Sequence, residues 1–320
     1  MTAKDHAEIE CAMTTHCELG RFALEDFGAV RIAGADAVRF LQGQLSNDVT
    51  RLGPEQALLA GYHNPQGRTI ALLRLAWLAD GELLALLPRE LAGAVAQRLS
   101  KYVLRAKVTV TDVSQDWRVS GLADADTLEQ AEPVVLPREQ LPGAHPYAQR
   151  RLDERLVLTA GGPSGRWLEI VPRAAAAPPA APRESWRLLD VRAGMPQVYA
   201  ATSEQFVAQM LNLDVLGAIA FDKGCYTGQE VIARAHYRGR IKRRAQRFCT
   251  DGALALAPGA LGRLPDGRAF TVVDAARRPD GRCEFLAVTA LPGEPSGADA
   301  ETSPASVQAE PLELPYALPA

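Results

Sequence analysis

The chain has 320 residues, enough for two or three domains that each bury a core of their own. Hydrophobic residues make up 47% of the chain and charged residues 23%, which is close to the averages of soluble globular proteins. The formal net charge of −3 excludes a protein that coats nucleic acid through its overall charge, so any anion binding has to be local.

Residues 1–19 are expected to form a flexible tail. They contain no apolar h-region, so no secretory signal is predicted. Cys11 and Cys17 lie near His6 and His16, but their spacing fits no common zinc pattern, and we predict no metal site. The chain has five cysteines, an odd number spread over its length, which favours reduced thiols and a cytoplasmic protein.

Residues 20–113 combine hairpins with helices. Apolar periodicity and turn signals predict strands over 29–32, 57–62, 69–78, 82–87 and 107–113, and helices over 35–45 and 89–103. The turn Asn64-Pro65-Gln66-Gly67 joins the second strand to the third. The apolar region over 69–88 is interrupted by Arg74, Asp80 and Glu82, so no membrane span is expected. This mixture indicates an α+β fold rather than a regular βαβ alternation.

A change of composition falls at residues 173–183, where Ala174 to Pro182 are all alanine or proline. We interpret this stretch as a solvated surface loop. Thr202 or Ser203 is then expected to cap a helix, with Phe206, Val207 and Met210 on its inner face. A further helix is predicted from about Gly228 to Ala235.

Beyond Lys242 the chain becomes rich in strand signals. Strands are predicted over 246–250, 269–273 and 283–291, separated by Asp266-Gly267 and Asp280-Gly281. Short strands at regular spacing indicate a small all-β module of the barrel type. Residues 292–310 are expected to form a flexible loop.

The segment from Lys223 to Glu230, K-G-C-Y-T-G-Q-E, has the features of a thiol site. A neighbouring ammonium and a helix start both favour thiolate, and glycine permits close approach of a ligand to the main chain. The alternative is a buried cysteine that acts as a small hydrophobe. A hydrolase would need a base, and neither His63 nor His236 has an orienting partner that the sequence identifies.

A strip of cations without an acid follows directly in residues 231–250. It offers donors for carboxylates or phosphates, and its flanking aromatics Tyr237 and Phe248 could stack on a base or another flat ring. The alternative is a solvated charged face. The cations are Arg234, Arg238, Arg240, Lys242, Arg243, Arg244 and Arg247.

These motifs resemble those of the YgfZ family, folate-binding and tRNA-modifying proteins related to the glycine-cleavage aminomethyltransferase. The resemblance covers most of residues 24–320. Besides Lys223 to Glu230 it rests on Phe40 to Val49, Pro65-Gln66-Gly67, Tyr102 to Val108, Gly194-Met195-Pro196, Asn212-Leu213-Asp214 with Leu216-Gly217, Ala233-Arg234, Tyr237-Arg238-Gly239, and Leu314-Pro315-Tyr316.

The resemblance implies folate-binding aminomethyltransferase-like domains over residues 20–240, with two subdomains, and a small β-barrel over 241–320. It implies a role in assembly or repair of iron–sulfur clusters in selected enzymes, which would support tRNA thiomethylation indirectly. The expected ligand is tetrahydrofolate or a derivative, and the expected partners are iron–sulfur enzymes or cluster carriers. A non-catalytic adaptor with folate as a structural ligand is the alternative, and direct tRNA binding through Arg240 to Arg247 is a third.

The resemblance also implies roles for individual residues. Cys225 is the expected functional thiol, which would make transient contact with a cluster, and Lys223, Gln229 and Glu230 surround it. The family's two folate-stacking tryptophans match Trp186 and Phe27, and phenylalanine keeps a π face without the indole N–H. The other expected folate-binding residues are Gly224, Tyr226, Gly228, Arg234 and Arg238.

One departure from the transferase bears on the activity. Transferases carry two aspartates after the glycine turn of the early hairpin, and here Ala71 and Leu72 occupy those positions. Neither side chain can carry a charge or a proton. A folate-dependent aminomethyltransferase is therefore disfavoured.

Overall fold

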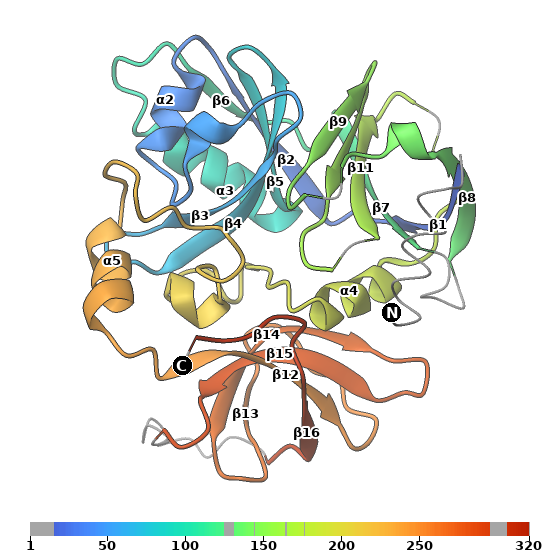
Figure 1. The fold of residues 1–320 in the computed structure, drawn as a ribbon, viewed down its shortest axis with the longest axis vertical. Coiled ribbons are helices and arrows are strands. Elements are labelled where there is room, and N and C mark those ends of the chain that lie inside the picture. The colour runs from blue at the N-terminus through green and yellow to red at the C-terminus, as the bar shows by residue number, and fades with distance from the viewer. Residues whose placement is uncertain are drawn as a thin grey trace.

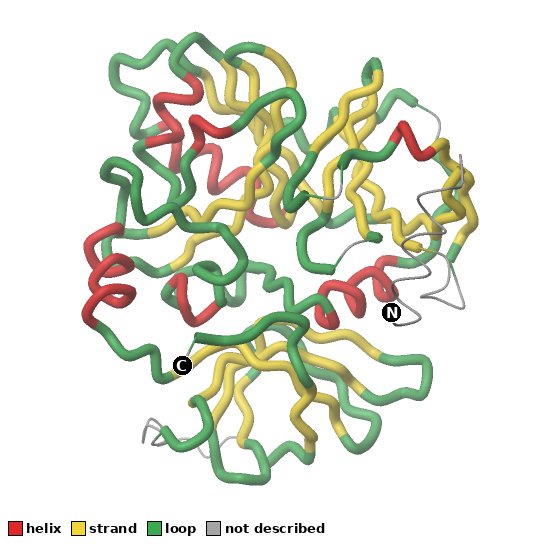
Figure 2. Tube along the Cα trace, viewed as in Figure 1, coloured by secondary structure: helices red, strands yellow, loops and turns green. Residues whose placement is uncertain are grey.

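A computed structural model describes residues 16–124, 131–143, 145–163, 165–175, 177–294 and 306–319. The described chain forms three lobes, each built on one β-sheet, and long loops and short helices lie between them (Figures 1 and 2). The strands within each sheet pair antiparallel. The α+β class is confirmed, and the fold is a mixed α/β arrangement of mostly antiparallel sheets.

The first lobe contains a sheet in the order β3-β4-β5-β2-β6. Its strands are β2 (Phe27–Ala33), β3 (Leu58–His63), β4 (Thr69–Ala79), β5 (Glu82–Pro88) and β6 (Thr109–Asp112). Helix α2 (Ala37–Gln42) leads into the 3-10 turn η1 (Val49–Arg51), and helix α3 (Arg89–Ser100) packs on β2 and β6. Leu91, Val95 and Leu99 of α3 are buried, as their helical spacing requires. All seven elements predicted for this region are present.

The second lobe contains a six-stranded sheet in the order β8-β1-β7-β11-β10-β9. Its strands are β1 (His16–Ala23), β7 (Trp117–Asp124), β8 (Glu132–Pro137), β9 (Gln149–Leu152), β10 (Arg155–Thr159) and β11 (Arg166–Pro172), and a 3-10 turn η3 (Arg138–Gln140) follows β8. Strand β1 begins at His16, so the prediction of a flexible tail was wrong for residues 16–19. Cys17 and Leu19 are buried there because the β1 side chains alternate between the two faces. His6 and Cys11 lie outside the described residues.

The third lobe contains a sheet in the order β13-β14-β15-β12-β16. Its strands are β12 (Arg243–Thr250), β13 (Leu261–Arg263), β14 (Ala269–Arg277), β15 (Cys283–Ala290) and β16 (Ala309–Leu312). One isolated parallel bridge joins Arg263, at the end of the edge strand β13, to Ser306, which lies before the other edge strand, β16. The expected β-barrel is therefore corrected to a curled sheet, because a single bridge does not close a strand ladder.

Two predictions about the segments that connect the lobes were wrong, in part for the surface loop over 173–183 and fully for the helix after Thr202. Ala181, in the alanine- and proline-rich stretch, is buried and exchanges main-chain hydrogen bonds with β1, so part of the expected surface loop is packed. After Thr202 the chain forms only a short 3-10 turn, η4 (Ala208–Leu211), in place of the expected helix. Of the residues expected on the inner face of that helix, Phe206 is buried, whereas Val207 and Met210 are half-buried.

Helix α4 (Arg183–Arg192) joins the lobes, and Figure 1 shows it between the second and third sheets. It packs on β14 and β15, while Trp186 enters the core between the first and second sheets. Helix α5 (Gln229–Arg238) lies on the outside of the first and third lobes (Figure 1). No helix in the described part of the chain is long and apolar enough to span a membrane.

Candidate thiol and ligand sites

Lys223 fastens the loop that carries Cys225 to the end of α2. Its Nζ donates to the main-chain oxygens of Gln42, Leu45 and Asn47 over 2.8, 2.7 and 2.8 Å. An ammonium has three donors, and all three are used here. Burial lowers the pKa of Lys223 to about 8, against the opposing effect of the Asp48 carboxylate.

Two side chains next to the Lys223 contact hold the start of the same loop. Ser46 Oγ donates to the carbonyl of Ala218 over 2.7 Å and accepts from the amide of Gly61 over 2.9 Å. Asn47 Nδ2 donates to the carbonyl of Gly217 over 2.8 Å. The segments 40–49 and 217–223 are therefore neighbours, and the polar residues Ser46, Asn47 and Lys223 join them.

Cys225 is exposed, whereas Tyr226 beside it is buried. Burial raises the pKa of Tyr226 to about 12. The Tyr226 ring lies 5.1 Å from Lys223 Nζ and 6.4 Å, between centroids, from the ring of His63. Tyr226 and Lys223 thus anchor the loop on both sides of a thiol that faces solvent. The alternative of a buried, inert cysteine is wrong.

Lys223 was expected to activate the thiol directly. In the structure its three protons go to carbonyl oxygens, and no hydrogen bond between described residues joins it to Cys225. Its contact with the thiol site is therefore one of positioning. The neighbouring glycine, Gly224, has open space around it, since no atom lies within 4 Å of an added Cβ.

Gly228 is the N-cap of α5 and packs against the turn of the first hairpin. Its φ is +81°, and a Cβ added to it would lie 2.5 Å from the carbonyl oxygen of Asn64 and 3.0 Å from the Cα of Gly67. Only glycine fits both constraints without strain. The side chains of Gln229 and Glu230 make no hydrogen bond within the described chain, and Glu230 lies in the first turn, where a carboxylate stabilises a helix.

His63 and His236 have environments that do not suit a catalytic base. His63 is 1% exposed, neither ring nitrogen has a partner within the described residues, and burial lowers its pKa to about 3. His236 is exposed on α5 and stacks on Phe221, with ring centroids 3.7 Å apart. The imidazole of His63 is therefore neutral at physiological pH.

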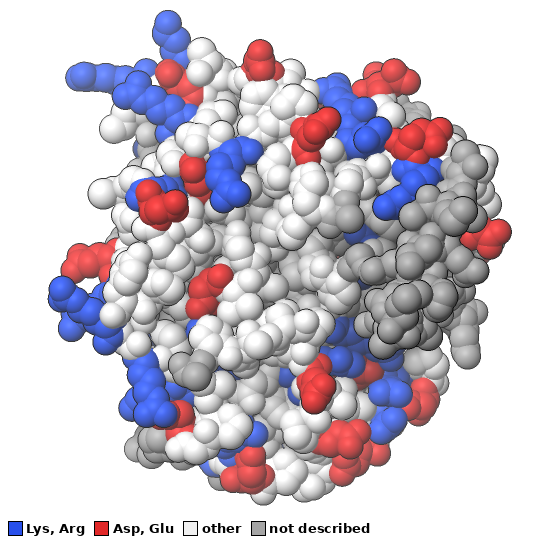
Figure 3. Space-filling model, viewed as in Figure 1, with Lys and Arg blue, Asp and Glu red and all other residues white. Residues whose placement is uncertain are grey.

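Three of the seven cations of the basic strip form ion pairs within the described chain. Arg240 pairs with Glu294 over 2.6 Å, Arg244 with Asp214 over 2.8 Å, and Arg247 with Glu284 over 2.6 Å. Phe248 is 1% exposed and packs in the third lobe, so the expectation that it could stack on a base is wrong. Basic and acidic side chains alternate over the face drawn in Figure 3.

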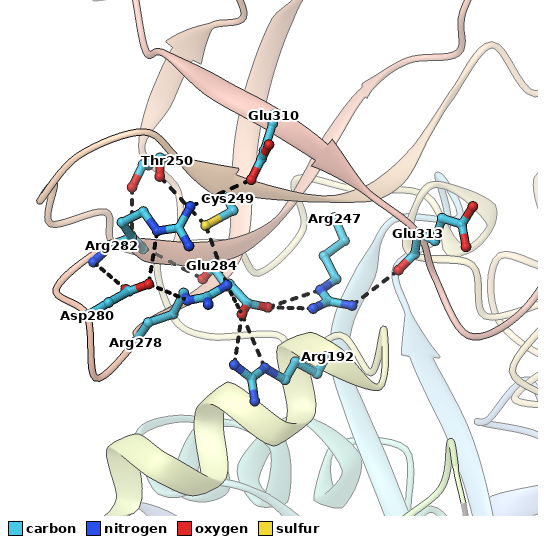
Figure 4. Close-up of polar contacts among 11 residues, drawn as sticks. Arg192, Arg247, Cys249, Thr250, Arg278, Asp280, Arg282, Glu284, Glu310 and Glu313 are labelled. Carbon is cyan, nitrogen blue, oxygen red and sulfur yellow. Dashed lines mark hydrogen bonds and ion pairs between the residues drawn. The ribbon is translucent and has the colours of Figure 1, made fainter. Parts of the chain in front are cut away.

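Glu284 also receives hydrogen bonds from Arg192 and Arg278, as Figure 4 shows. Burial acts to raise its pKa, but the hydrogen bonds from Arg192 and Arg247 more than offset this and the pKa is lowered. Since Arg192 belongs to α4, this carboxylate ties the third sheet to α4. Arg247 is therefore a structural residue, and the exposed cations of the strip that have no ion pair in the described chain include Arg234 and Arg238 on α5.

Phe27 and Trp186 belong to one buried cluster between the first and second sheets. The Arg74 guanidinium lies over the Phe27 ring, 5.7 Å from its centroid, and that of Arg166 lies 4.9 Å from the centroid of Trp186. A Cβ on Gly121 would lie 2.2 Å from the Trp186 ring, so the indole packs directly on that glycine. Both rings are thus covered by arginines, whereas Arg234 and Arg238 lie outside on α5.

Two pockets adjoin this cluster. Phe27 lines one of about 80 Å³ together with Arg89, Arg118 and Arg173. Arg166 lines another of about 350 Å³, within the size range of ligand sites. The local sequence around these four arginines gives no signal of a site. Arg74, whose guanidinium lies over Phe27, does stand out in the sequence as a single cation inside an apolar strand.

Comparison with known proteins identifies sequence relatives of this chain. No family model matches the chain. It is 32% identical over 231 residues to the tRNA-modifying protein YgfZ of Yersinia pestis, covering 69% of this chain and 68% of that protein. It is 33% identical over 282 residues to the tRNA-modifying protein YgfZ of an Enterobacter species, covering 81% and 82%.

The fold has a counterpart among solved structures. The glycine cleavage system aminomethyltransferase T of Bartonella henselae superposes with a TM-score of 0.60 at 16% identity, covering 86% of this chain and 79% of that one. At this identity the likeness concerns the fold alone. The expected aminomethyltransferase-like architecture is confirmed to that extent.

Proposed function

Because this chain belongs to the YgfZ family of tRNA-modifying proteins, we propose that it binds a reduced folate and assists assembly or repair of iron–sulfur clusters in selected enzymes. Its effect on tRNA modification is then indirect and passes through an iron–sulfur enzyme that modifies tRNA. The thiol of Cys225 is the contact point for the cluster or for the protein that carries it.

The exposure of Cys225 between two anchored neighbours carries this proposal. The loop holds the thiol at the surface, because Lys223 is hydrogen-bonded to three carbonyl oxygens and Tyr226 is buried. A thiol that binds iron gives up its proton and does so as thiolate. One cysteine supplies one of the four ligands that a cluster usually needs, so the client or carrier supplies the others.

The folate part of the proposal is supported by the residues between the first and second sheets. A folate offers a flat pterin ring and carboxylates, which aromatic rings and guanidinium groups respectively bind. Phe27 and Trp186 supply rings, and Arg166 has a buried Nε without a partner in the described chain. The aromatic and cationic groups present therefore fit this ligand class.

Folate-dependent aminomethyl transfer is disfavoured for this chain. Ala71 and Leu72, at the positions of the transferase aspartates, are both 0% exposed and belong to the apolar core of the first lobe. That strand offers no acid at those positions. Bound folate is accordingly proposed as a ligand of an assembly factor.

The alternative is an adaptor that holds a client without using the thiol. A cell-free assay separates the two: an inactive iron–sulfur enzyme is incubated with a cluster donor and either the wild-type protein or Cys225→Ser. We expect the variant to lose the stimulation of client activity. Equal stimulation would favour the adaptor.

Folate binding is tested separately by calorimetric titration of the wild-type protein with tetrahydrofolate under reducing conditions. Saturable binding is expected. Absence of heat and of any shift in unfolding temperature at millimolar ligand would contradict the folate part and leave the thiol part standing.

A further inference from the structure

Arg74 is a buried cation in an apolar setting. It lies in the middle of β4, is 4% exposed, and faces Leu59 on β3 and Leu86 on β5 across the sheet. Its guanidinium rests on the ring of Phe27, 5.7 Å from the centroid. A buried arginine is rare unless it is paired.

No partner for Arg74 exists in the described chain. Its Nε and Nη1 are buried without a hydrogen bond, and it forms no ion pair there. Arg244, which is 3% exposed, gives the contrast: its guanidinium binds both carboxylate oxygens of Asp214, over 2.9 and 2.8 Å. The protein thus gives one buried arginine a carboxylate that binds both of its terminal nitrogens, and gives the other no carboxylate in the described chain.

The charges around Arg74 do not balance it. Its ionisable neighbours include Arg166, a second buried cation, which itself pairs with Asp190. Another ionisable neighbour, Tyr147, donates its hydroxyl proton to the carbonyl of Leu216 over 2.7 Å, and burial raises the pKa of this phenol. Neither neighbour therefore supplies Arg74 with a negative charge.

An unpaired guanidinium in such a place destabilises the ligand-free protein, since its desolvation is not repaid by a counter-charge. A carboxylate is the group that matches the planar fork of donors. Phe27 also lines the pocket that contains Arg89, Arg118 and Arg173, so the ring that supports Arg74 borders a cationic pocket.

We propose that Arg74 is a ligand-binding residue, which receives a carboxylate of the ligand held between the first and second sheets, with the Phe27 ring as its support. For the identity of the ligand this rests on the proposed folate binding, and the carboxylate is then one on the glutamate end. The unpaired state of Arg74 in the free protein is independent of that identity.

Arg74→Met tests both statements, with Arg244→Met as the matched control. In the ligand-free protein, Arg74→Met is expected to raise the unfolding temperature, whereas Arg244→Met, which leaves Asp214 unpaired, is expected to lower it. With tetrahydrofolate, Arg74→Met should bind roughly ten- to a hundred-fold more weakly than the wild type, the loss expected for one charged hydrogen-bonded contact. Arg74→Lys keeps the positive charge but loses the planar guanidinium, so its affinity for tetrahydrofolate should lie between those of the wild type and Arg74→Met.

A tetrahydropterin without the glutamate end locates the contact. Its affinity should be the same for wild type and Arg74→Met. An equal loss for both ligands, or an unchanged affinity of Arg74→Met for tetrahydrofolate, would overturn the assignment. So would a fall in the unfolding temperature of ligand-free Arg74→Met like that of Arg244→Met.

Failure of the proposed function gives a different result. If the wild type binds no folate, glutarate replaces it as the probe. A rise in unfolding temperature with glutarate in the wild type, and none in Arg74→Met, would keep the carboxylate site and remove the folate. No rise in either protein would overturn the inference.

Discussion

The Nζ of Lys223 lies 2.7 Å from the carbonyl oxygen of Leu45, a residue just after the end of α2. The two residues are 178 positions apart in the sequence. This contact joins two motifs that the sequence presents far apart. The lysine beside the cysteine therefore fixes the place of the loop that carries the thiol.

Lys223→Met is expected to release the thiol loop. Three carbonyl oxygens, those of Gln42, Leu45 and Asn47, lose their donor, and we expect a stability loss of about 2 kcal/mol together with faster amide exchange over residues 217–227. Urea unfolding and hydrogen exchange measure both. Lys101→Met, an exposed lysine, is the control; equal exchange in the two variants would contradict the anchoring role.

Alanine substitutions at the two glycines on either side of Cys225 are expected to differ in their cost to stability. Gly228→Ala places a Cβ 2.5 Å from the Asn64 carbonyl oxygen at a φ of +81°, and should cost about 2 kcal/mol. Gly224→Ala meets no atom within 4 Å and has an ordinary φ, so its effect should stay within about 0.5 kcal/mol. Urea unfolding of both proteins decides this. A costly Gly224→Ala with a neutral Gly228→Ala would refute the described loop.

The buried imidazole of His63 should make the stability of the protein depend on pH. Burial lowers its pKa to about 3, below the unfolded value of 6.5, so between these values the unfolded chain binds a proton that the folded chain does not. Stability should therefore fall as the pH drops from 6.5 towards 3, by about 2 kcal/mol between pH 7 and pH 5 from this group. His63→Phe, which fills the same space with an aromatic ring, should lose that part of the slope. Unchanged slopes by urea unfolding would contradict a buried neutral imidazole.

The Glu284 carboxylate, which ties the third sheet to α4, is expected to contribute strongly to the stability of the protein. Glu284→Gln keeps the shape but leaves Arg192, Arg247 and Arg278 without their carboxylate, and should cost about 3 kcal/mol. Asp266→Asn, which removes an exposed pair, should cost less than about 1 kcal/mol. Thermal unfolding compares the two; equal losses would argue against a buried charge network.

Local pattern was sufficient for the first lobe and insufficient for the second. Strands β3, β4 and β5 lie in one meander with clear turn signals, so each could be located from its own residues. No element was predicted between residues 113 and 183. The six-stranded sheet there depends on β1, from the expected tail, pairing with β7 and β8 more than 90 residues later, which local periodicity does not reveal.

The candidate site also has a part that the sequence predicts and a part that it does not. The motif around Cys225 could be recognised because its residues are contiguous. The pairing of Arg244 and Arg247 with Asp214 and Glu284 could not, because a run of cations has the same sequence pattern whether it faces solvent or buried carboxylates. Arg74 was visible as a cation in an apolar run, but its lack of a partner is a property of the folded state.

The activity of iron–sulfur enzymes in cells that lack this protein tests the central claim most directly. Cells are supplied with the wild type, Cys225→Ala or, as a control at an exposed position, Lys101→Met at equal protein level, and the activity of an iron–sulfur enzyme that modifies tRNA is measured with the modified nucleoside as readout. We expect wild type and Lys101→Met to restore it and Cys225→Ala to fail. Full restoration by Cys225→Ala would contradict the claim that the exposed thiol is the functional group.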